Sequence, residues 1–132
     1  MWLEGRLSQD TKGAKQMIKQ KLEILVESQI IEKTTEDYVL KVLDYLLATK
    51  IISDATKADV FLTHLAMADA RRKKNESIAS LDDFIVAEIT GDPNFLHSKE
   101  LWQDLEEMAE NKFEEAELDY FYLHIINMLK ED

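Results

Sequence analysis

The sequence predicts an all-α fold, an antiparallel bundle of five to six helices, and three observations lead to that prediction. Apolar residues recur at spacings of three and four along nearly the whole chain, which is the period of an amphipathic helix. Only three glycines and one proline interrupt the sequence, too few for the many turns of a β-rich fold. The length of 132 residues suits one domain with a single core.

The first two helices are predicted from their apolar stripes and from residues suited to their starts. We expect the first helix to run from about Lys12 to Glu32. Thr34 or Thr35 can cap the second, because a side-chain oxygen there accepts a free backbone N–H, and this helix should end near Lys50. The residues expected to face the core are Met17, Ile18, Leu22, Leu25, Val26, Gln29 or Ile30, Tyr38, Val39, Val42, Leu43 and Leu46.

Two further helices are predicted in the middle of the chain. Ser53 or Asp54 can cap a third helix that reaches about Lys74. Ser80, followed by two aspartates, opens a short fourth helix that ends at Gly91. Residues 91–94, Gly-Asp-Pro-Asn, form the strongest helix-breaking segment of the sequence. The core-facing residues expected in the third helix are Ala58, Phe61, Leu62, Leu65 and Ala68.

The last two helices follow that break. Ser98 begins a predicted fifth helix and Glu114 a sixth. His97, just after the break, is expected to be an exposed residue at a helix start. Because each stripe covers one face of its helix, the helices should pack together as a bundle. The expected core-facing residues are Leu101, Trp102, Leu105, Met108, Ala109, Leu118, Phe121, Tyr122, Ile125, Ile126 and Leu129.

The domain organisation and charge limit the possible partners. We expect one domain over residues 12–132, preceded by a loose segment over residues 1–11 whose Trp2 and Leu3 can dock on the bundle. A net charge of −11 repels phosphate backbones, and the basic run over residues 71–74 is too short for a nucleic-acid footprint, so we expect no direct nucleic-acid binding. No signal peptide and no membrane-spanning run is present, which predicts a cytoplasmic location and no membrane contact.

No constellation of catalytic or metal-binding residues stands out. The sequence contains no cysteine, no glycine-rich phosphate loop and no nucleophile elbow. His64 and Asp69 have the spacing of a helical metal pair, but only two other histidines exist and no Glu-x-x-His occurs. We therefore predict that the protein is not an enzyme and has no catalytic residues, no metal site and no cofactor.

Two histidines in the centres of apolar helices remain, His64 and His124. A single histidine in such a place is ordinarily a satisfied core or boundary residue. Each of these two, however, has a charged residue seven positions away on its own helix face, Arg71 after His64 and Glu117 before His124. An arginine favours an added phosphate, and a carboxylate fixes the tautomer of an imidazole. Seven residues are about 10.5 Å of helical rise, so direct contact is not assured.

The two segments around these histidines resemble the two signatures of phosphotransferase-system regulation domains. The stretch Phe61–Arg71 has a histidine in an apolar helix and an arginine seven residues later. The stretch Glu117–Ile125 has a glutamate, then aromatic and aliphatic residues, and a Leu-His-Ile triplet. His64 and His124 are 60 residues apart, close to the separation found in that family. The likeness covers residues 30 to 130.

The resemblance implies a bacterial regulatory module with a five-helix bundle that tends to form homodimers. It implies that His64 and His124 are phosphoacceptors, that Arg71 neutralises the phosphate and that Glu117 orients His124. The phosphate donor would be the histidine-containing phosphocarrier protein or a sugar-specific transporter subunit. In this family such phosphorylation controls transcription or antitermination of genes for carbohydrate use. Because the chain holds one such module and no RNA- or DNA-binding domain, we expect a stand-alone module that acts in trans through protein contacts.

One alternative function remains open at this point. The chain can be an acidic helical adaptor that keeps the fold without the phosphorylation switch and binds a partner protein through exposed apolar or aromatic residues. Replacing both histidines would then leave binding of that partner intact.

Overall fold

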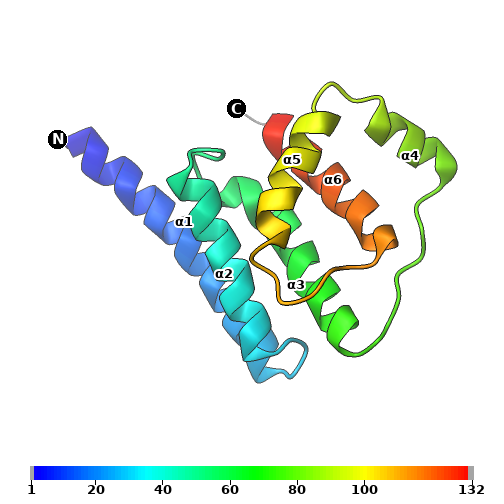
Figure 1. The fold of residues 1–132 in the computed structure, drawn as a ribbon. Coiled ribbons are helices and arrows are strands. Elements are labelled where there is room, and N and C mark those ends of the chain that lie inside the picture. The colour runs from blue at the N-terminus through cyan, green and yellow to red at the C-terminus, as the bar shows by residue number, and fades with distance from the viewer. Residues whose placement is uncertain (1, 131–132) are drawn as a thin grey trace.

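The computed structural model describes the backbone of residues 2–130 and the side chains of residues 13–130. Over that range it contains six α-helices, one short 3-10 helix and no strand, so the predicted all-α class is confirmed (Figure 1). None of these helices, as far as the chain is described, has both the length and the apolar character that a bilayer crossing requires. The elements are α1 Trp2–Glu27, α2 Lys33–Ala48, η1 Ala55–Ala58 (3-10), α3 Asp59–Lys73, α4 Asp83–Thr90, α5 Phe95–Glu106 and α6 Glu115–Lys130.

Helix α3 lies at the centre of the arrangement, between α2 on one side and α6 on the other. The helices α1 and α2 run antiparallel along one edge of the molecule, and α1 also contacts η1 (Figure 1). On the other side α6 packs against both α5 and α4. This arrangement gives α3 two different neighbours, so that opposite faces of one helix meet side chains from two separate segments.

The first three helices end in the same backbone motif, which none of the sequence signals revealed. Gln29, Lys50 and Asn75 each have a left-handed φ near 60° two residues after a helix ends. In each case the next backbone N–H bonds to the carbonyl five residues earlier, at 2.8 to 3.1 Å. This is the Schellman motif, which usually has glycine at the left-handed position. The first helix therefore ends at Glu27, not at the expected Glu32.

Several expected helix starts also need correction. The first helix begins at Trp2 rather than Lys12, so the backbone of residues 2–11 is helical instead of forming the expected loose segment, because the one glycine in this range, Gly5, is not enough to end a helix. The docking expected of Trp2 and Leu3 concerns side chains outside the described part of the structure. Neither threonine caps α2, whose N-cap is Glu32, without a side-chain hydrogen bond. Asp54, whose carboxylate accepts the N–H of Thr56, caps the 3-10 helix η1, whereas α3 itself begins at Asp59 with Ala58 as its N-cap.

The fifth helix begins at Phe95, three residues before the expected start at Ser98. The hydroxyl of Ser98 is buried and donates to the backbone oxygen of Phe95 at 2.6 Å, so this serine lies inside the first turn instead of capping it. Helix α6 begins one residue after the expected Glu114. The fourth helix has Asp82 as its N-cap, two residues after the expected Ser80, and Gly91 as its C-cap, where the sequence predicts the helix to end.

The core is formed by the predicted stripes, with an aromatic cluster at its centre. The rings of Phe61, Trp102, Phe113 and Phe121 pack together from α3, α5, α6 and the loop before α6, with Phe121 6.2 Å or less from each of the other three. Burying a side chain of this size contributes roughly 1.5–3 kcal/mol. Met17, expected in the core, is instead 70% exposed on α1.

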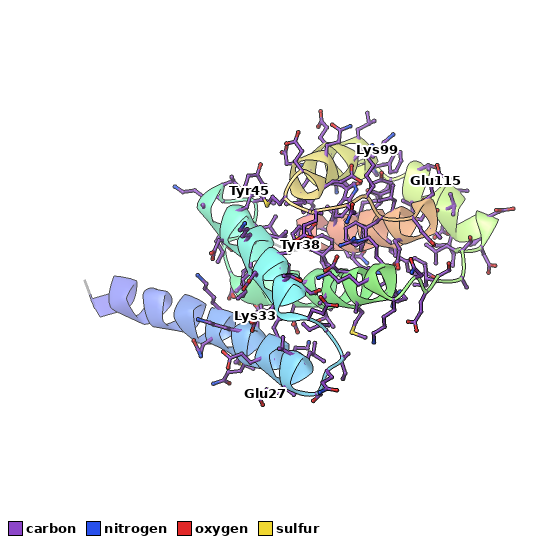
Figure 2. The ribbon with its side chains drawn as sticks, turned by 60° about the horizontal axis from the view of Figure 1, so that its bottom comes forward. Glu27, Lys33, Tyr38, Tyr45, Lys99 and Glu115 are labelled. Carbon is purple, nitrogen blue, oxygen red and sulfur yellow. The ribbon has the colours of Figure 1, made fainter. Side chains whose placement is uncertain are left out.

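Two tyrosines of α2 tie this helix to α5. Tyr38 and Tyr45 lie on the side of α2 that faces α5 (Figure 2). The hydroxyl of Tyr38 donates to the backbone oxygen of Leu105 at 3.1 Å, and that of Tyr45 donates to Asp104 at 3.0 Å. These bonds bridge the two sides of the molecule and hold α3 in place between them.

Candidate functional site

The two histidines singled out in the sequence meet in the structure. His64 lies in α3 and His124 in α6, and these two helices pack directly against each other. The ring centroids are 5.0 Å apart and the ring planes are inclined at 47°. Both side chains are only partly buried. The helix packing thus joins two residues that are 60 positions apart in the chain into one imidazole pair.

A buried carboxylate connects this pair to an arginine. Glu117 is at the start of α6, and its Oε1 lies 3.4 Å from Nε2 of His64, a long contact that falls short of a good hydrogen bond. Arg71 donates from Nε to Oε2 of Glu117 at 2.9 Å and from Nη2 to Oε1 at 3.0 Å. This two-bond arrangement fixes the plane of the carboxylate. The pair Arg71–Glu117 therefore holds a negative charge at one edge of the His64 ring.

Aromatic rings from α6 fix the orientation of the His64 ring. Tyr120 stacks on it with a centroid distance of 5.2 Å and an interplanar angle of 17°. Phe121 meets it edge-on at 5.6 Å. The hydroxyl of Tyr120 donates to the backbone oxygen of Ala79, which anchors the stacking ring to the segment between α3 and α4. The imidazole of His64 is thus held by one carboxylate, two aromatic rings and a second imidazole.

Both histidines border an open depression of about 420 Å³ between α1, α3 and α6. Lys21 reaches into it from α1 and donates to the hydroxyl of Thr63 at 2.8 Å and to Asp59 at 3.1 Å. The hydroxyl of Thr63 in turn donates to the backbone oxygen of Asp59. The depression thus has two cations along its wall, Lys21 and Arg71, and each is already paired with a carboxylate.

Both imidazoles are held in their neutral form by their surroundings. Burial lowers the pKa of His64 below its ordinary value of 6.5, and Glu117 opposes that shift while the charge of Arg71 adds to it. Burial also lowers the pKa of His124, and the neighbouring His64 adds to the effect. A neutral imidazole has a free electron pair on one ring nitrogen. Both rings can therefore act as nucleophiles or phosphoryl acceptors near neutral pH.

The structure corrects one expected role and leaves another as a prediction. Glu117 was expected to orient His124, but its carboxylate contacts His64 and Arg71 instead. Arg71, expected to neutralise a phosphate, does line the depression, although two of its donor groups are bonded to Glu117. His97 lies exposed in the first turn of α5, as the sequence predicts.

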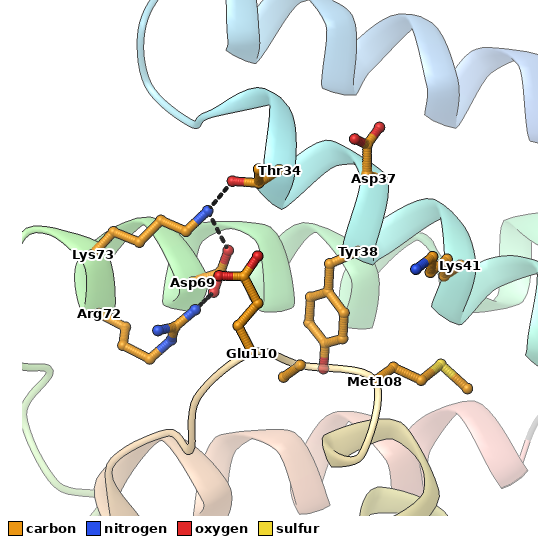
Figure 3. Close-up of a pocket in the computed structure, with 10 residues that line it drawn as sticks. Thr34, Asp37, Tyr38, Lys41, Asp69, Arg72, Lys73, Met108 and Glu110 are labelled. Carbon is orange, nitrogen blue, oxygen red and sulfur yellow. Dashed lines mark hydrogen bonds and ion pairs between the residues drawn. The ribbon is translucent and has the colours of Figure 1, made fainter.

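A second buried carboxylate, Asp69, lies on the opposite side of α3 and contacts α2. It accepts the hydroxyl of Thr35 at 2.5 Å and a hydrogen bond from Arg72, and Lys73 lies 3.4 Å away. Figure 3 shows Arg72 and Lys73 converging on Asp69 at the edge of a small polar cavity of about 230 Å³. Asp69 therefore points away from His64, and the metal pair suggested by their spacing does not form.

Across residues 13–130 no three histidine, aspartate or glutamate side chains converge where they could hold a metal ion.

Two features of the structure were not predicted from the sequence. They are the position of Lys21 at the depression and the contact between Thr35 and Asp69. Both depend on contacts between helices, from residues 42 and 34 positions apart, and no local pattern signals such contacts.

No protein-family model matches the chain, and no match was found among curated proteins or solved structures.

Proposed function

We propose that this chain is a regulatory module of the phosphotransferase-system type, which responds to phosphorylation of His64 or His124 and passes the signal on through protein contacts. The observation that carries the proposal is the pairing of two imidazoles, with ring centroids 5.0 Å apart, beside an open depression with two cations in its wall. The family resemblance supplies the donor, a phosphocarrier protein or a sugar-specific transporter subunit, and the downstream role in transcription or antitermination of genes for carbohydrate use.

The physical effect of a phosphate at this place supports a switch. A phosphoryl group adds roughly −1.5 to −2 charges and three strong acceptor oxygens. It would arise beside the Arg71–Glu117 and Lys21–Asp59 pairs, which join α3 to α6 and α1 to α3. New charge there favours exchange of partners by Arg71 and Lys21 and so changes how three helices are held together. A homodimer formed through these helices would sense that change.

The test is phosphorylation by a defined donor. The chain is incubated with phosphocarrier protein that has been phosphorylated from phosphoenolpyruvate, and intact mass and acid lability of the phosphate are measured. We expect an acid-labile phosphate on the wild type and on His97→Gln, and none on a variant that carries both His64→Gln and His124→Gln. An unlabelled wild type, or label that survives in the double variant, would show the proposal to be wrong.

The adaptor hypothesis has its own support in the exposed apolar side chains. Phe84 on α4 and Leu96 on α5 are 74% and 72% exposed. Large apolar side chains on a surface are a feature of protein-binding sites. For a partner that binds the wild type, the adaptor hypothesis predicts that the double histidine variant keeps its affinity while Phe84→Ser loses it. The switch hypothesis predicts that phosphorylation changes the affinity.

A further inference from the structure

The imidazole pair faces one shared depression, and this geometry limits how many phosphates it can hold. We propose that His64 and His124 form a single composite site, which accepts one phosphoryl group per chain on either ring and excludes a second. This inference rests on the proposed phosphorylation, and it adds a stoichiometry that the family resemblance does not supply. It follows from the distance between the rings, the charges around them and the space that they share.

The first argument is the distance. The ring centroids are 5.0 Å apart, so phosphoryl groups directed from both rings into the shared depression would place two near-dianions within several ångströms of each other. Even at the dielectric constant of water, repulsion at that range disfavours the second group on the order of 100-fold relative to the first. Partial burial of both rings strengthens the repulsion, because less water screens it.

The second argument is the supply of positive charge. Among the described side chains that line the depression, the cations are Lys21 and Arg71 and the acid is Asp59, while Glu117 contacts Arg71 without lining the depression itself. Each cation is paired with one acid, so the wall is balanced before any phosphate is present. One phosphate can draw Lys21 away from Asp59, since both of these side chains are partly exposed. For a second phosphate the described wall offers no further cation.

The third argument concerns the far side of His124, which also borders a neighbouring depression of about 490 Å³. A phosphoryl group directed into that space would be farther from His64. Its wall includes two lysines, Lys57 and Lys130, and the polar side chains of Thr56 and Asn127. Lys130 is paired with Asp92 at 2.8 Å across the end of α6. Only His124 borders that space, whereas both imidazoles border the shared depression, so the shared depression is the one that can serve either ring.

The transfer step itself needs nothing beyond the donor. The unprotonated ring nitrogen of His64 or His124 forms a new N–P bond while the N–P bond of the phosphocarrier histidine breaks. The electron pair of the broken bond returns to the carrier's ring nitrogen, and the proton on the other nitrogen of each ring stays in place. Because the second ring lies next to the first, phosphorylation of either one leaves the other facing an occupied site.

The test counts phosphates under conditions in which access of the donor protein is not limiting. The chain is treated with excess phosphoramidate, a small phosphoryl donor, in the His97→Gln background, which removes the only other histidine of the sequence. Intact mass then gives the number of phosphates per chain. We expect one phosphate on this background, one after adding His64→Gln, one after adding His124→Gln, and none when both are replaced. The same background unfolded in guanidinium should accept two, because the rings are then apart.

The possible outcomes separate this inference from the proposed function. Two phosphates on the folded background would overturn the composite site while leaving a phosphorylation switch intact. Label that disappears in one single variant and persists in the other would also overturn it, since the rings would then not share the group. No phosphate on the folded chain from either phosphoramidate or the phosphocarrier, with two on the unfolded chain, would overturn the proposed function and this inference together.

Discussion

Asp69 and Glu117 are buried carboxylates that stand on opposite sides of α3, and each accepts hydrogen bonds from an arginine of that helix, yet their surroundings differ in kind. Asp69 has a hydroxyl and two permanently charged groups around it, from Thr35, Arg72 and Lys73. The Glu117 carboxylate has one permanent cation and one histidine, and the histidine borders an open depression.

This difference separates a structural clamp from a site that can respond. The groups around Asp69 are a guanidinium, an ammonium and a hydroxyl, with no imidazole among them, so the α2–α3 contact has one state. The Glu117 network includes an imidazole whose proton and whose modification are both variable. The lesson is that a buried ion pair alone says little about function. The presence of a titratable, partly exposed neighbour is what gives such a pair more than one state.

The largest effect on stability is expected from loss of the contacts that Asp69 makes with Thr35, Arg72 and Lys73. Replacing Asp69 by alanine leaves Arg72 and Lys73 without their buried partner, and removal of one member of a buried pair costs about 3–5 kcal/mol of unfolding free energy. Urea denaturation measures this loss. Glu100→Ala, an exposed acid on α5, is the matched control and should change stability by less than about 0.5 kcal/mol. Equal effects of both variants would show that the Asp69 network contributes no special stability.

The next largest effect is expected from replacement of Glu117, which should change the unfolding free energy and also the pKa of His64 more than that of His124. Glu117→Gln keeps the shape but removes a charge that accepts two hydrogen bonds from Arg71, which should cost about 1.5–3 kcal/mol. It should also lower the pKa of His64 further, because Glu117 acts to raise it. NMR titration of both imidazoles gives the readout, with His124 as the internal reference that responds less. A rise in the pKa of His64 would contradict the geometry.

The wrong prediction for the partner of Glu117 shows why the fold was predicted better than the site. The stripe of α3 was predicted correctly because burial depends on a local period, and Phe61, Leu62 and Leu65 all face the core. Which side chain a residue such as Glu117 contacts depends, in contrast, on how neighbouring helices pack. A residue two turns along its own helix is about 10.5 Å away, whereas axes of packed helices lie about 8–10 Å apart, so the nearest partner is often on the neighbour. Glu117 was accordingly assigned to His124 and contacts His64.

The end of the first helix was missed for a different reason. The first and second helices turn out of the helix at Gln29 and Lys50, residues whose type carries no signal for a left-handed backbone. Asp54 and Gly91 are residue types that favour helix ends, and the 3-10 helix η1 begins directly after Asp54 while α4 ends directly before Gly91. A helix boundary can be predicted from one sequence where the residue at that place is of a type that favours helix ends. It cannot be predicted where a residue without such a preference adopts an uncommon backbone conformation.

The two networks should also lose stability in different pH ranges. Burial lowers the folded-state pKa of both histidines below 6.5, so the unfolded chain binds more protons and stability falls as the pH drops below about 6.5. Burial acts to raise the pKa of Asp69, but the hydrogen bonds from Thr35 and Arg72 and the nearby cations hold it below 3.8. Its contribution to stability is present above 3.8 and is lost only as the pH falls through the lowered value.

Unfolding free energies measured from pH 7.5 to 5 should therefore decrease by about 1 kcal/mol more for the wild type than for a variant that carries both His64→Gln and His124→Gln. Asp69→Asn, compared in the same range, should leave this slope unchanged, because the Asp69 carboxylate does not titrate there. Identical slopes for the wild type and the double histidine variant would mean that the imidazoles are as easily protonated in the folded chain as in the unfolded one.

Replacement of Lys21 should have the smallest effect on stability. This replacement is also the most specific test of the side of α3 that carries the imidazole pair. Lys21 and Asp59 are each 44% exposed, and ion pairs of that kind contribute at most about 1 kcal/mol. Lys21→Gln should thus change the unfolding free energy by less than about 1 kcal/mol. The same variant removes a cation from the wall beside the imidazole pair, so the phosphorylated fraction reached with a limiting phosphoryl donor should fall about 2- to 5-fold. Lys99→Gln, on the exposed face of α5, is the control for loss of one positive charge. An equal fall in both variants would assign the effect to overall charge and not to the position of Lys21 at the depression.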